Sequence, residues 1–369
     1  MRQFFSSNFF CFAFLIFVLL LVNLEPLYKK AKALTCQQCF SKDDYRILEE
    51  EGIKDVAQRT KEMISAGIIK YNHLGDNPVY LDSIPYITHH VYFTASGDPK
   101  TIKPIDILNI IKTSFELNKI NPKWKHYIWT NQPEIMPKEF EMIPNLEIRN
   151  IEEFKNHFLY KELSSLIYAT NFSKRYFAAS SDIARLMIVE KFGGIYMDLD
   201  YEIYEYKTLM QLIRSNNFVS GAIVESVNFY EVNSSFFAAK PGHTIISTAL
   251  SLSYRNLTST SLPNYINFPC SKFHSGIVTT MVPLTVGIYK ALDIKTDILL
   301  PIRFIFNIYK PELPYTAIVS KEIYQLKYQE KPIGNDRFSG SWHQKSYMED
   351  EPCLKNFKNE LLELMADNK

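Results

Sequence analysis

The sequence lacks an excess of charge of either sign. Its 369 residues include 41 lysines and arginines against 40 aspartates and glutamates, the formal net charge is +1, and no long basic run occurs. Proteins that bind nucleic acids normally carry a basic patch, so we expect no nucleic-acid partner. Internal repeats and low-complexity segments are also missing, and 46% apolar residues suffice for one large domain with appendages.

Cysteine is scarce, with five residues in the chain. Cys11 lies inside an apolar run, and the other four, Cys36, Cys39, Cys270 and Cys353, are able to pair, which agrees with a lumenal or secreted fate. Cys36 and Cys39 form a C-x-x-C pair, but neither a second ligand pair at zinc-site spacing nor a βαβ pattern accompanies them. We expect a structural disulfide in this region.

Charged residues are missing from a long N-terminal segment. Phe9–Val22 is an unbroken apolar run of fourteen residues, and nineteen are counted from Phe4. Fourteen fits a signal peptide and nineteen fits a single membrane span. Ala31-Lys32-Ala33 offers a cleavage site farther from the run than usual, so we expect an uncleaved signal anchor over residues 1–33, with a cleaved signal peptide as the alternative.

Helical and strand patterns alternate after this segment. We expect a helical stem over residues 34–80, strands at 84–93, 124–130 and 146–151, a helix at 105–118, further helices up to 190, and a C-terminal helix over 346–369. This alternation predicts an α/β sheet. Ligands of open α/β sheets bind beyond the carboxyl ends of the strands.

Residues 180–206 carry the most informative pattern. Ser181 is suited to cap a helix, Asp182 falls in its first turn, and Gly193 and Gly194 end it. Alternation with period two then places Ile195, Met197 and Leu199 on one face and Tyr196, Asp198 and Asp200 on the other. Both carboxylates are expected on one face, near the end of a buried strand.

The Asp-x-Asp tripeptide suggests a cation site. Carboxylates at i and i+2 of an extended strand have Cα atoms roughly 6.6 Å apart, so they share one ion only if the strand bends. A cation such as Mg²⁺ or Mn²⁺ on one or two carboxylates completes its shell with water and phosphate oxygens, which points to a phosphate-bearing substrate. A solvated loop remains open for the tripeptide alone, whereas an EF-hand is excluded by Ile203 and Leu209 at its sixth and twelfth positions.

The longer pattern resembles the DXD-containing sugar-binding-region glycosyltransferases, which include glycosyltransferase family 32. Their shared pattern is a serine–aspartate pair, an arginine three residues later, Gly-Gly-Ile-Tyr and Asp-x-Asp. Here it is Ser181-Asp182, Arg185, Gly193-Gly194-Ile195-Tyr196 and Asp198-Leu199-Asp200. The Met-Asp-Leu-Asp form is similar to inositolphosphoceramide mannosyltransferases.

The resemblance covers roughly residues 84–342. Further segments in the family's order are Ile84–Tyr92, Asn121–Thr130, Ala238–His243 and Gly340–Trp342. The sequence departs from the family where a histidine often precedes the closing Ser-Trp, because Asp336 and Arg337 lie there and His343 follows instead. This departure leaves the third metal ligand open.

The resemblance implies a GT-A-type, Rossmann-like mixed sheet flanked by helices over residues 84–345. It also implies metal-dependent transfer of a hexose from a nucleotide sugar with retention of configuration, and Mn²⁺ or Mg²⁺ as the cofactor. The implied catalytic residues are Asp198, Asp200 and Arg185, and the implied metal ligands are Asp200 and Asp198, with His343 as a candidate for the open third position. The implied donor-binding residues are Tyr92, Asp182, Arg185, Gly194, Tyr196, Asp198 and Trp342. Arg185 as a structural partner of a carboxylate and Tyr92 as a core residue stay open.

The resemblance further implies GDP-mannose or a UDP-hexose as donor, a lipid or glycan as acceptor, and a single-pass Golgi or secretory-pathway membrane location with a lumenal catalytic domain. The alternatives are a secreted, toxin-like enzyme that glycosylates proteins and a non-catalytic sugar-nucleotide-binding protein. A metal-dependent phosphohydrolase would use the same carboxylates, but its two-metal site needs a second ligand cluster, and we find none in the sequence.

Overall fold

The computed structural model describes residues 65–68, 78–95, 102–168, 177–225, 229–258, 277–301 and 333–336. The N-terminal segment 1–33, most of the stem, all five cysteines, Trp342, His343 and the C-terminal helix lie outside these residues. Within the described ranges, no helix combines the length and the apolar character needed to cross a bilayer.

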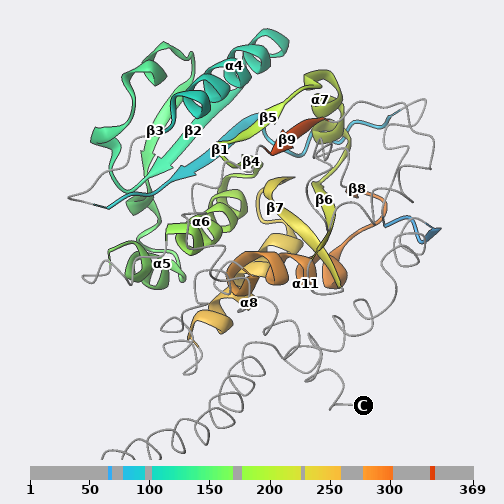
Figure 1. Ribbon diagram of the computed structural model, residues 1–369. Coiled ribbons are helices and arrows are strands. Elements are labelled where there is room, and N and C mark those ends of the chain that lie inside the picture. Colours follow the sequence, from blue (N-terminus) through green and yellow to red (C-terminus); the bar gives the residue numbers. More distant parts are fainter. Residues whose placement is uncertain are drawn as a thin grey trace, which may run out of the picture.

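A seven-stranded mixed sheet forms the centre of the molecule, as the alternation of elements predicts (Figure 1). Its strand order is β3-β2-β1-β4-β7-β6-β8. The strands are β1 (Ile87–Tyr92), β2 (Lys125–Thr130), β3 (Leu146–Asn150), β4 (Gly194–Met197), β6 (Phe218–Glu225), β7 (Phe229–Ala239) and β8 (Asp297–Pro301). The first four are parallel, and β7 runs antiparallel to both of its neighbours. A separate pair joins β5 (Tyr201–Ile203) to β9 (Gly334–Asp336).

Helices cover both faces of the sheet (Figure 1). On one face lie α4 (Pro104–Ile120) and α7 (Tyr206–Ser215), and on the other lie α5 (Tyr160–Ile167), α6 (Phe177–Phe192), α8 (Thr244–Thr258) and α11 (Val282–Ala291). Short 3-10 turns occur at Pro133–Ile135, Lys138–Met142 and Ile151–Phe154, and a π-helical turn at Ile277–Met281 leads into α11. The predicted strands and the helix at 105–118 agree with the structure to within a few residues.

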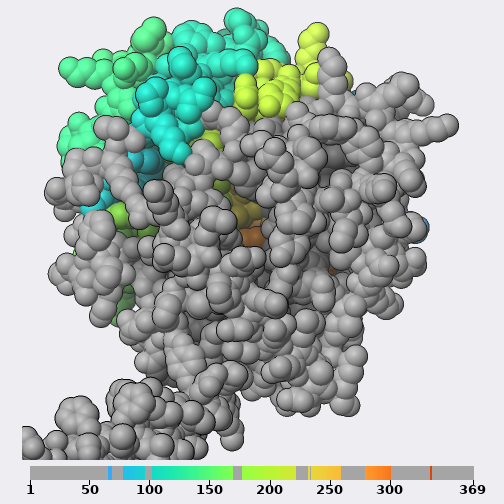
Figure 2. All heavy atoms as spheres, in the orientation of Figure 1, coloured from blue at the N-terminus to red at the C-terminus, as the bar shows by residue number. Residues whose placement is uncertain are grey.

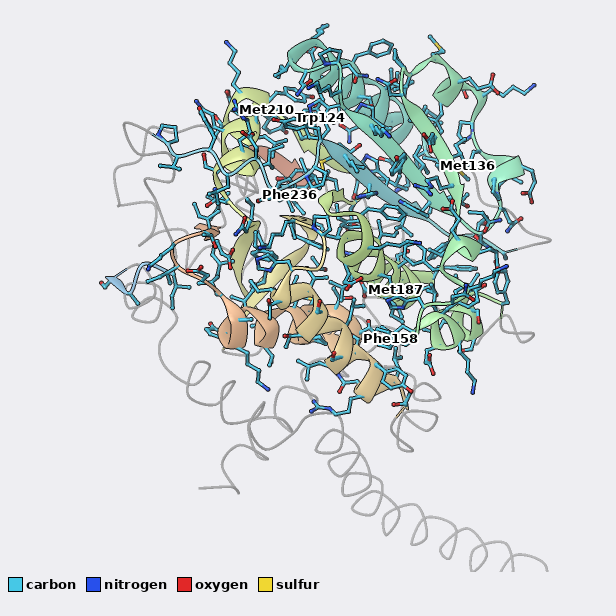
Figure 3. The ribbon with its side chains drawn as sticks, turned by 180° about the vertical axis from the view of Figure 1, so that it is seen from behind. Trp124, Met136, Phe158, Met187, Met210 and Phe236 are labelled. Carbon is cyan, nitrogen blue, oxygen red and sulfur yellow. The ribbon has the colours of Figure 1, made fainter. Side chains whose placement is uncertain are left out.

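The alternation predicted for β4 is confirmed by the two core layers. Tyr196 packs with Trp129 and Met187 on the α6 face, whereas Ile195 and Met197 pack on the α4 face. Figure 3 labels members of both layers, with Met187 on α6 and Trp124 beside α4. The sequence pattern therefore identifies the faces of this strand correctly.

The start of α6 differs from the prediction. The helix begins at Phe177, so Ser181 lies inside it and is not its cap, and Asp182 is not in its first turn. Ala179 and Ser180 are buried, and packing of this additional turn outweighs the local capping preference of Ser181. The predicted end is right, because the helix stops at Phe192 before two glycines with positive φ.

Candidate active site

The two carboxylates of the Asp-x-Asp motif lie in a tight turn, not in an extended strand. β4 ends at Met197, and the amide of Tyr201 donates to the carbonyl oxygen of Asp198 at 3.0 Å. The amide of Asp198 in turn donates to the carbonyl oxygen of Ser235 on β7, at 2.8 Å. The expectation of an extended motif is therefore wrong, and the bend that a shared cation requires is present.

Arg185 connects the helix α6 to this turn. Its Nη2 lies 2.9 Å from Oδ1 of Asp182, three residues earlier in the helix, and 3.5 Å from Oδ1 of Asp198. Its Nη1 donates to the carbonyl oxygen of Ser234 at 2.6 Å. The side chain of Arg185 is 8% exposed, whereas that of Asp198 is 31% exposed. The guanidinium group is thus fixed beneath a carboxylate that a ligand can reach.

Tyr196 completes this arrangement from within the core. Its hydroxyl group donates to Oδ1 of Asp198 at 2.7 Å, and the guanidinium carbon of Arg185 lies 4.6 Å from its ring centre. The residue is 1% exposed, so nearly all of it lies within the core. Tyr196 orients Asp198 and supports Arg185 by a cation–π contact.

The protonation of the site is governed by burial and by neighbouring acids. Burial raises the pKa of Asp182 to about 7, opposed by Arg185 and assisted by Asp198. Burial also raises the pKa of Asp198, again opposed by Arg185, with the nearby carboxylate of Asp200 adding to the increase. Tyr196 stays protonated because burial raises its pKa well above the usual value. Two carboxyl groups, those of Asp182 and Asp198, therefore contact one guanidinium group, and Asp200 adds a third negative charge close to Asp198.

This donor set fits a hard divalent cation. Asp198 and Asp200 present carboxylate oxygens from a single turn, and their mutual repulsion would be relieved by a positive ion. The described residues contain no group of three or more His, Cys, Asp and Glu side chains arranged to hold a metal. The protein would thus supply two carboxylates, and water and substrate phosphates would complete the shell.

Tyr92 lies close to the motif because β1 and β4 are parallel neighbours. His89 pairs with Tyr196, and Nδ1 of His90 donates to the carbonyl oxygen of Met197 at 2.9 Å, so Tyr92 follows at the same edge of the sheet. The Tyr92 ring is half-buried and packs in the same cluster as Leu199. It therefore borders the motif.

Gly194 lies at the opposite end of β4 from Asp198. Its φ is +94°, and a Cβ at this position would lie 2.6 Å from the carbonyl oxygen of Ile87. The structure thus gives Gly194 a packing role between β1 and β4. His89 and His90 face opposite layers, and both are buried.

The structure also places residues near the motif that the sequence pattern does not indicate. Oγ1 of Thr279, on the π-helical turn, donates to Oδ2 of Asp182 at 3.4 Å. Nδ2 of Asn109, on α4, donates to the carbonyl oxygens of Leu199 at 3.2 Å and Tyr201 at 2.7 Å. Asn109 is a polar residue on the buried face of a helix, and this is the one sequence signal that would have drawn attention to it.

Comparison with known proteins bears on this site directly. Residues 109–219 match the family model described as glycosyltransferase sugar-binding region containing DXD motif. The match confirms the resemblance found in the sequence and supports the predicted glycosyltransferase class. Among curated proteins, none matches the chain.

Several solved glycosyltransferases are similar to the structure at low identity. The PaToxG glycosyltransferase is 18% identical over 73% of this chain and 84% of its own, with a TM-score of 0.39. The galactosyltransferase LgtC, solved with donor and acceptor sugar analogues, is 10% identical over 76% and 95%, with a TM-score of 0.36. The catalytic domain of alpha-toxin from Clostridium novyi is 11% identical over 81% and 86%, with a TM-score of 0.34.

Proposed function

We propose that this protein is a metal-dependent glycosyltransferase of GT-A type that moves a hexose from a nucleotide-sugar donor. The observation that carries the proposal is the convergence of Asp182, Arg185 and the Asp198–Tyr201 turn at one edge of the sheet. All of these residues lie within the segment that matches the family model.

We assign different roles in donor binding to the residues of the site. Asp198 and Asp200 would hold Mn²⁺ or Mg²⁺, which stabilises the negative charge that develops on a departing nucleotide diphosphate. Arg185 holds Asp182 and Asp198 in place, and we assign Asp182 and Arg185 to the hydroxyl groups of the donor sugar. Tyr92 is assigned to the nucleotide base because it borders the turn at the carboxyl end of β1.

The proposal extends to the identity of the substrates. The Met197–Asp200 form of the motif supports GDP-mannose, with a UDP-hexose as the other candidate donor, and a lipid or glycan acceptor. Retention of configuration follows from the same resemblance. The N-terminal apolar run supports attachment to a membrane. The resemblance supports a secretory-pathway location with the catalytic domain in the lumen, and we assign Trp342 and His343 to closing the site.

Donor hydrolysis by the purified full-length protein tests the proposal. UDP- and GDP-sugars are screened with and without Mn²⁺, and free hexose and nucleotide diphosphate are quantified separately. We expect Mn²⁺-dependent hydrolysis of one donor, lost in Asp200→Ala. Glu202→Gln is the matched control, because it removes a carboxylate two residues away that forms a surface ion pair with Lys112 at 3.1 Å.

Two results would contradict the proposal. Release of inorganic phosphate without free hexose would indicate a phosphohydrolase. If no donor is hydrolysed and no donor binds in calorimetry, a non-catalytic role is favoured. Transfer to a protein instead of a lipid or glycan would retain the enzyme class and change the acceptor.

A further inference from the structure

The backbone of the carboxylate turn is held by three neighbouring elements. His90 on β1 donates to the carbonyl oxygen of Met197, just before the turn. The carbonyl oxygen of Ser235 on β7 accepts from the amide of Asp198. The carbonyl oxygens beyond Asp198, those of Leu199 and Tyr201, both accept from Nδ2 of Asn109 on α4.

Asn109 therefore holds both sides of Asp200. The Leu199 carbonyl belongs to the peptide bond that precedes Asp200, and the Tyr201 carbonyl belongs to the next residue along. A single amide group that donates both of its hydrogens to these oxygens fixes the backbone from which the Asp200 carboxylate projects. Figure 1 shows α4 beside β5, which begins at Tyr201 and whose residues contact α4. In Figure 2 the teal surface of α4 likewise adjoins the yellow-green surface that contains α7.

Asparagine is a poor choice for this position on local grounds alone. It lies inside α4, where leucine or alanine would favour the helix, and it is only 7% exposed. Its Oδ1 is buried and has no hydrogen-bond partner among the described residues, which costs stability. A residue that violates helix propensity and polar satisfaction is expected where function requires it.

We propose that Asn109 is a positioning residue for the metal-binding carboxylates. By fixing the backbone on both sides of Asp200, it keeps Asp198 and Asp200 in the one bent arrangement in which they share a divalent cation. The inference rests on the proposed function, and it adds a group on a separate helix that determines the cation affinity without touching the cation.

Asn118 provides a matched control on the same helix. Its Nδ2 donates to a backbone carbonyl oxygen, that of Pro144 at 3.2 Å, and its Oδ1 also lacks a partner in the described part of the chain. The two asparagines thus have the same chemistry in the same element, and Asn109 differs in holding the carboxylate turn.

The experiment compares Asn109→Ala, Asn109→Asp and Asn118→Ala in the full-length protein. Mn²⁺ binding is titrated by electron paramagnetic resonance, and donor hydrolysis and thermal unfolding are recorded in parallel. Removal of groups that orient metal ligands typically weakens metal binding about 10–100-fold. We expect the Mn²⁺ dissociation constant to rise at least about tenfold in both Asn109 variants and to stay within about twofold in Asn118→Ala.

Each other outcome has a definite meaning. The inference would be overturned if the Mn²⁺ dissociation constant changed equally in the Asn109 and Asn118 variants. It would also be overturned if the Asn109 variants had lower melting temperatures but unchanged Mn²⁺ binding. Loss of cooperative unfolding in both Asn109 variants but not in Asn118→Ala would overturn it too, because Asn109 would then support the whole fold. If the wild-type protein neither binds Mn²⁺ nor hydrolyses a donor, the proposed function itself fails.

Discussion

At the scale of single residues, Tyr196 and Arg185 both contact the same oxygen, Oδ1, of Asp198. This shared contact orients the carboxylate of Asp198. Tyr196→Phe keeps the ring beneath Arg185 and removes only the hydroxyl group. A hydrogen bond to a charged group contributes about 1.5–3 kcal/mol, so we expect kcat/KM for donor hydrolysis to fall about tenfold or more and the melting temperature to fall by several degrees.

The control for Tyr196→Phe is Tyr127→Phe. Tyr127 is a buried tyrosine of the same core layer, on β2. Steady-state kinetics of both variants measure the loss of activity, and thermal unfolding measures the loss of stability. Equal loss of activity in both would show that the Tyr196 hydroxyl group has no specific role at Asp198.

Asp182 is expected to impose a pH dependence on activity. Burial raises the pKa of its carboxyl group to about 7, so the ionised form that pairs with Arg185 predominates only above that pH. Donor hydrolysis should increase between pH 6 and 8, and Asp182→Asn should remove this increase and lower kcat/KM about 10–100-fold. Profiles of kcat/KM against pH measure both effects.

Asp297→Asn is the comparison for Asp182→Asn. Asp297 is a buried aspartate on β8 whose Oδ1 lies 3.2 Å from Nε2 of His243. Its replacement should lower the melting temperature and leave the pH profile unchanged. A profile that still rises between pH 6 and 8 in Asp182→Asn would assign the titration to another group.

At the scale of elements, β4 depends on the absence of a side chain at its first residue. A Cβ on Gly194 would meet the carbonyl oxygen of Ile87 at 2.6 Å, and its φ is +94°. We expect Gly194→Ala to lower the free energy of unfolding by about 2–5 kcal/mol, and to abolish donor hydrolysis because β4 leads directly into the turn at Asp198. Urea unfolding followed by fluorescence measures the change.

Gly242→Ala separates backbone strain from the steric clash. Gly242 also has a positive φ, +62°, but apart from its chain neighbours no atom of the described residues lies within 4 Å of the place that a Cβ would take there. Its replacement should cost only about 1 kcal/mol and preserve hydrolysis. Equal destabilisation of the two variants would show that the contact with Ile87 is not what fixes β4.

The elements that sequence alone identifies correctly are those set by local patterns. The glycine stop after Phe192 and the alternation of Ile195, Tyr196 and Met197 depend on neighbours in the chain. The turn at Asp198 depends instead on residues that are distant in the sequence. Hydrogen bonds with Ser235 on β7 and Asn109 on α4 hold it. Likewise, no local pattern reveals the contacts of Arg185 with Ser234 or of Asp182 with Thr279.

At the scale of the whole molecule, the topology explains why the site lies between β1 and β4. After β1 the chain adds β2 and β3 on one side, and it then returns to add β4 on the other side of β1. Ligands of open α/β sheets bind at such a reversal of strand order, beyond the carboxyl ends of the strands. Tyr92 and Asp198 come from the two strands that meet there.

The same central strands make the whole fold sensitive to acid. Burial lowers the pKa of His89 to about 3, of His90 to about 4 and of His126 to about 3. In the unfolded chain each histidine has a pKa of about 6.5. Below that pH the unfolded state therefore takes up protons that the folded state does not, and the free energy of unfolding falls as the pH falls.

The size of the effect is worked out from the three histidines and from Asp182, and the raised pKa of Asp198 opposes the loss as well. At pH 5 each histidine should lower the free energy of unfolding by on the order of 2 kcal/mol. Asp182 acts in the opposite direction, because its folded pKa is raised to about 7 and protonation on going from pH 7 to 5 stabilises the folded state by on the order of 2 kcal/mol. The net loss from these groups is about 4 kcal/mol, a large part of the about 5–15 kcal/mol that holds a typical fold.

Urea unfolding at pH 7 and pH 5 measures this loss, and His89→Gln identifies its source. His89 donates from Nε2 to the carbonyl oxygen of Gly193, next to the start of β4, and accepts from Nε1 of Trp129. Glutamine retains a donor and an acceptor but does not titrate, so the difference between the two pH values should shrink by on the order of 2 kcal/mol. An unchanged difference would mean that His89 is protonated in the folded state. In that case the hydrogen bond to Gly193 would have to be strong enough to offset the burial of a charge between β1 and β4.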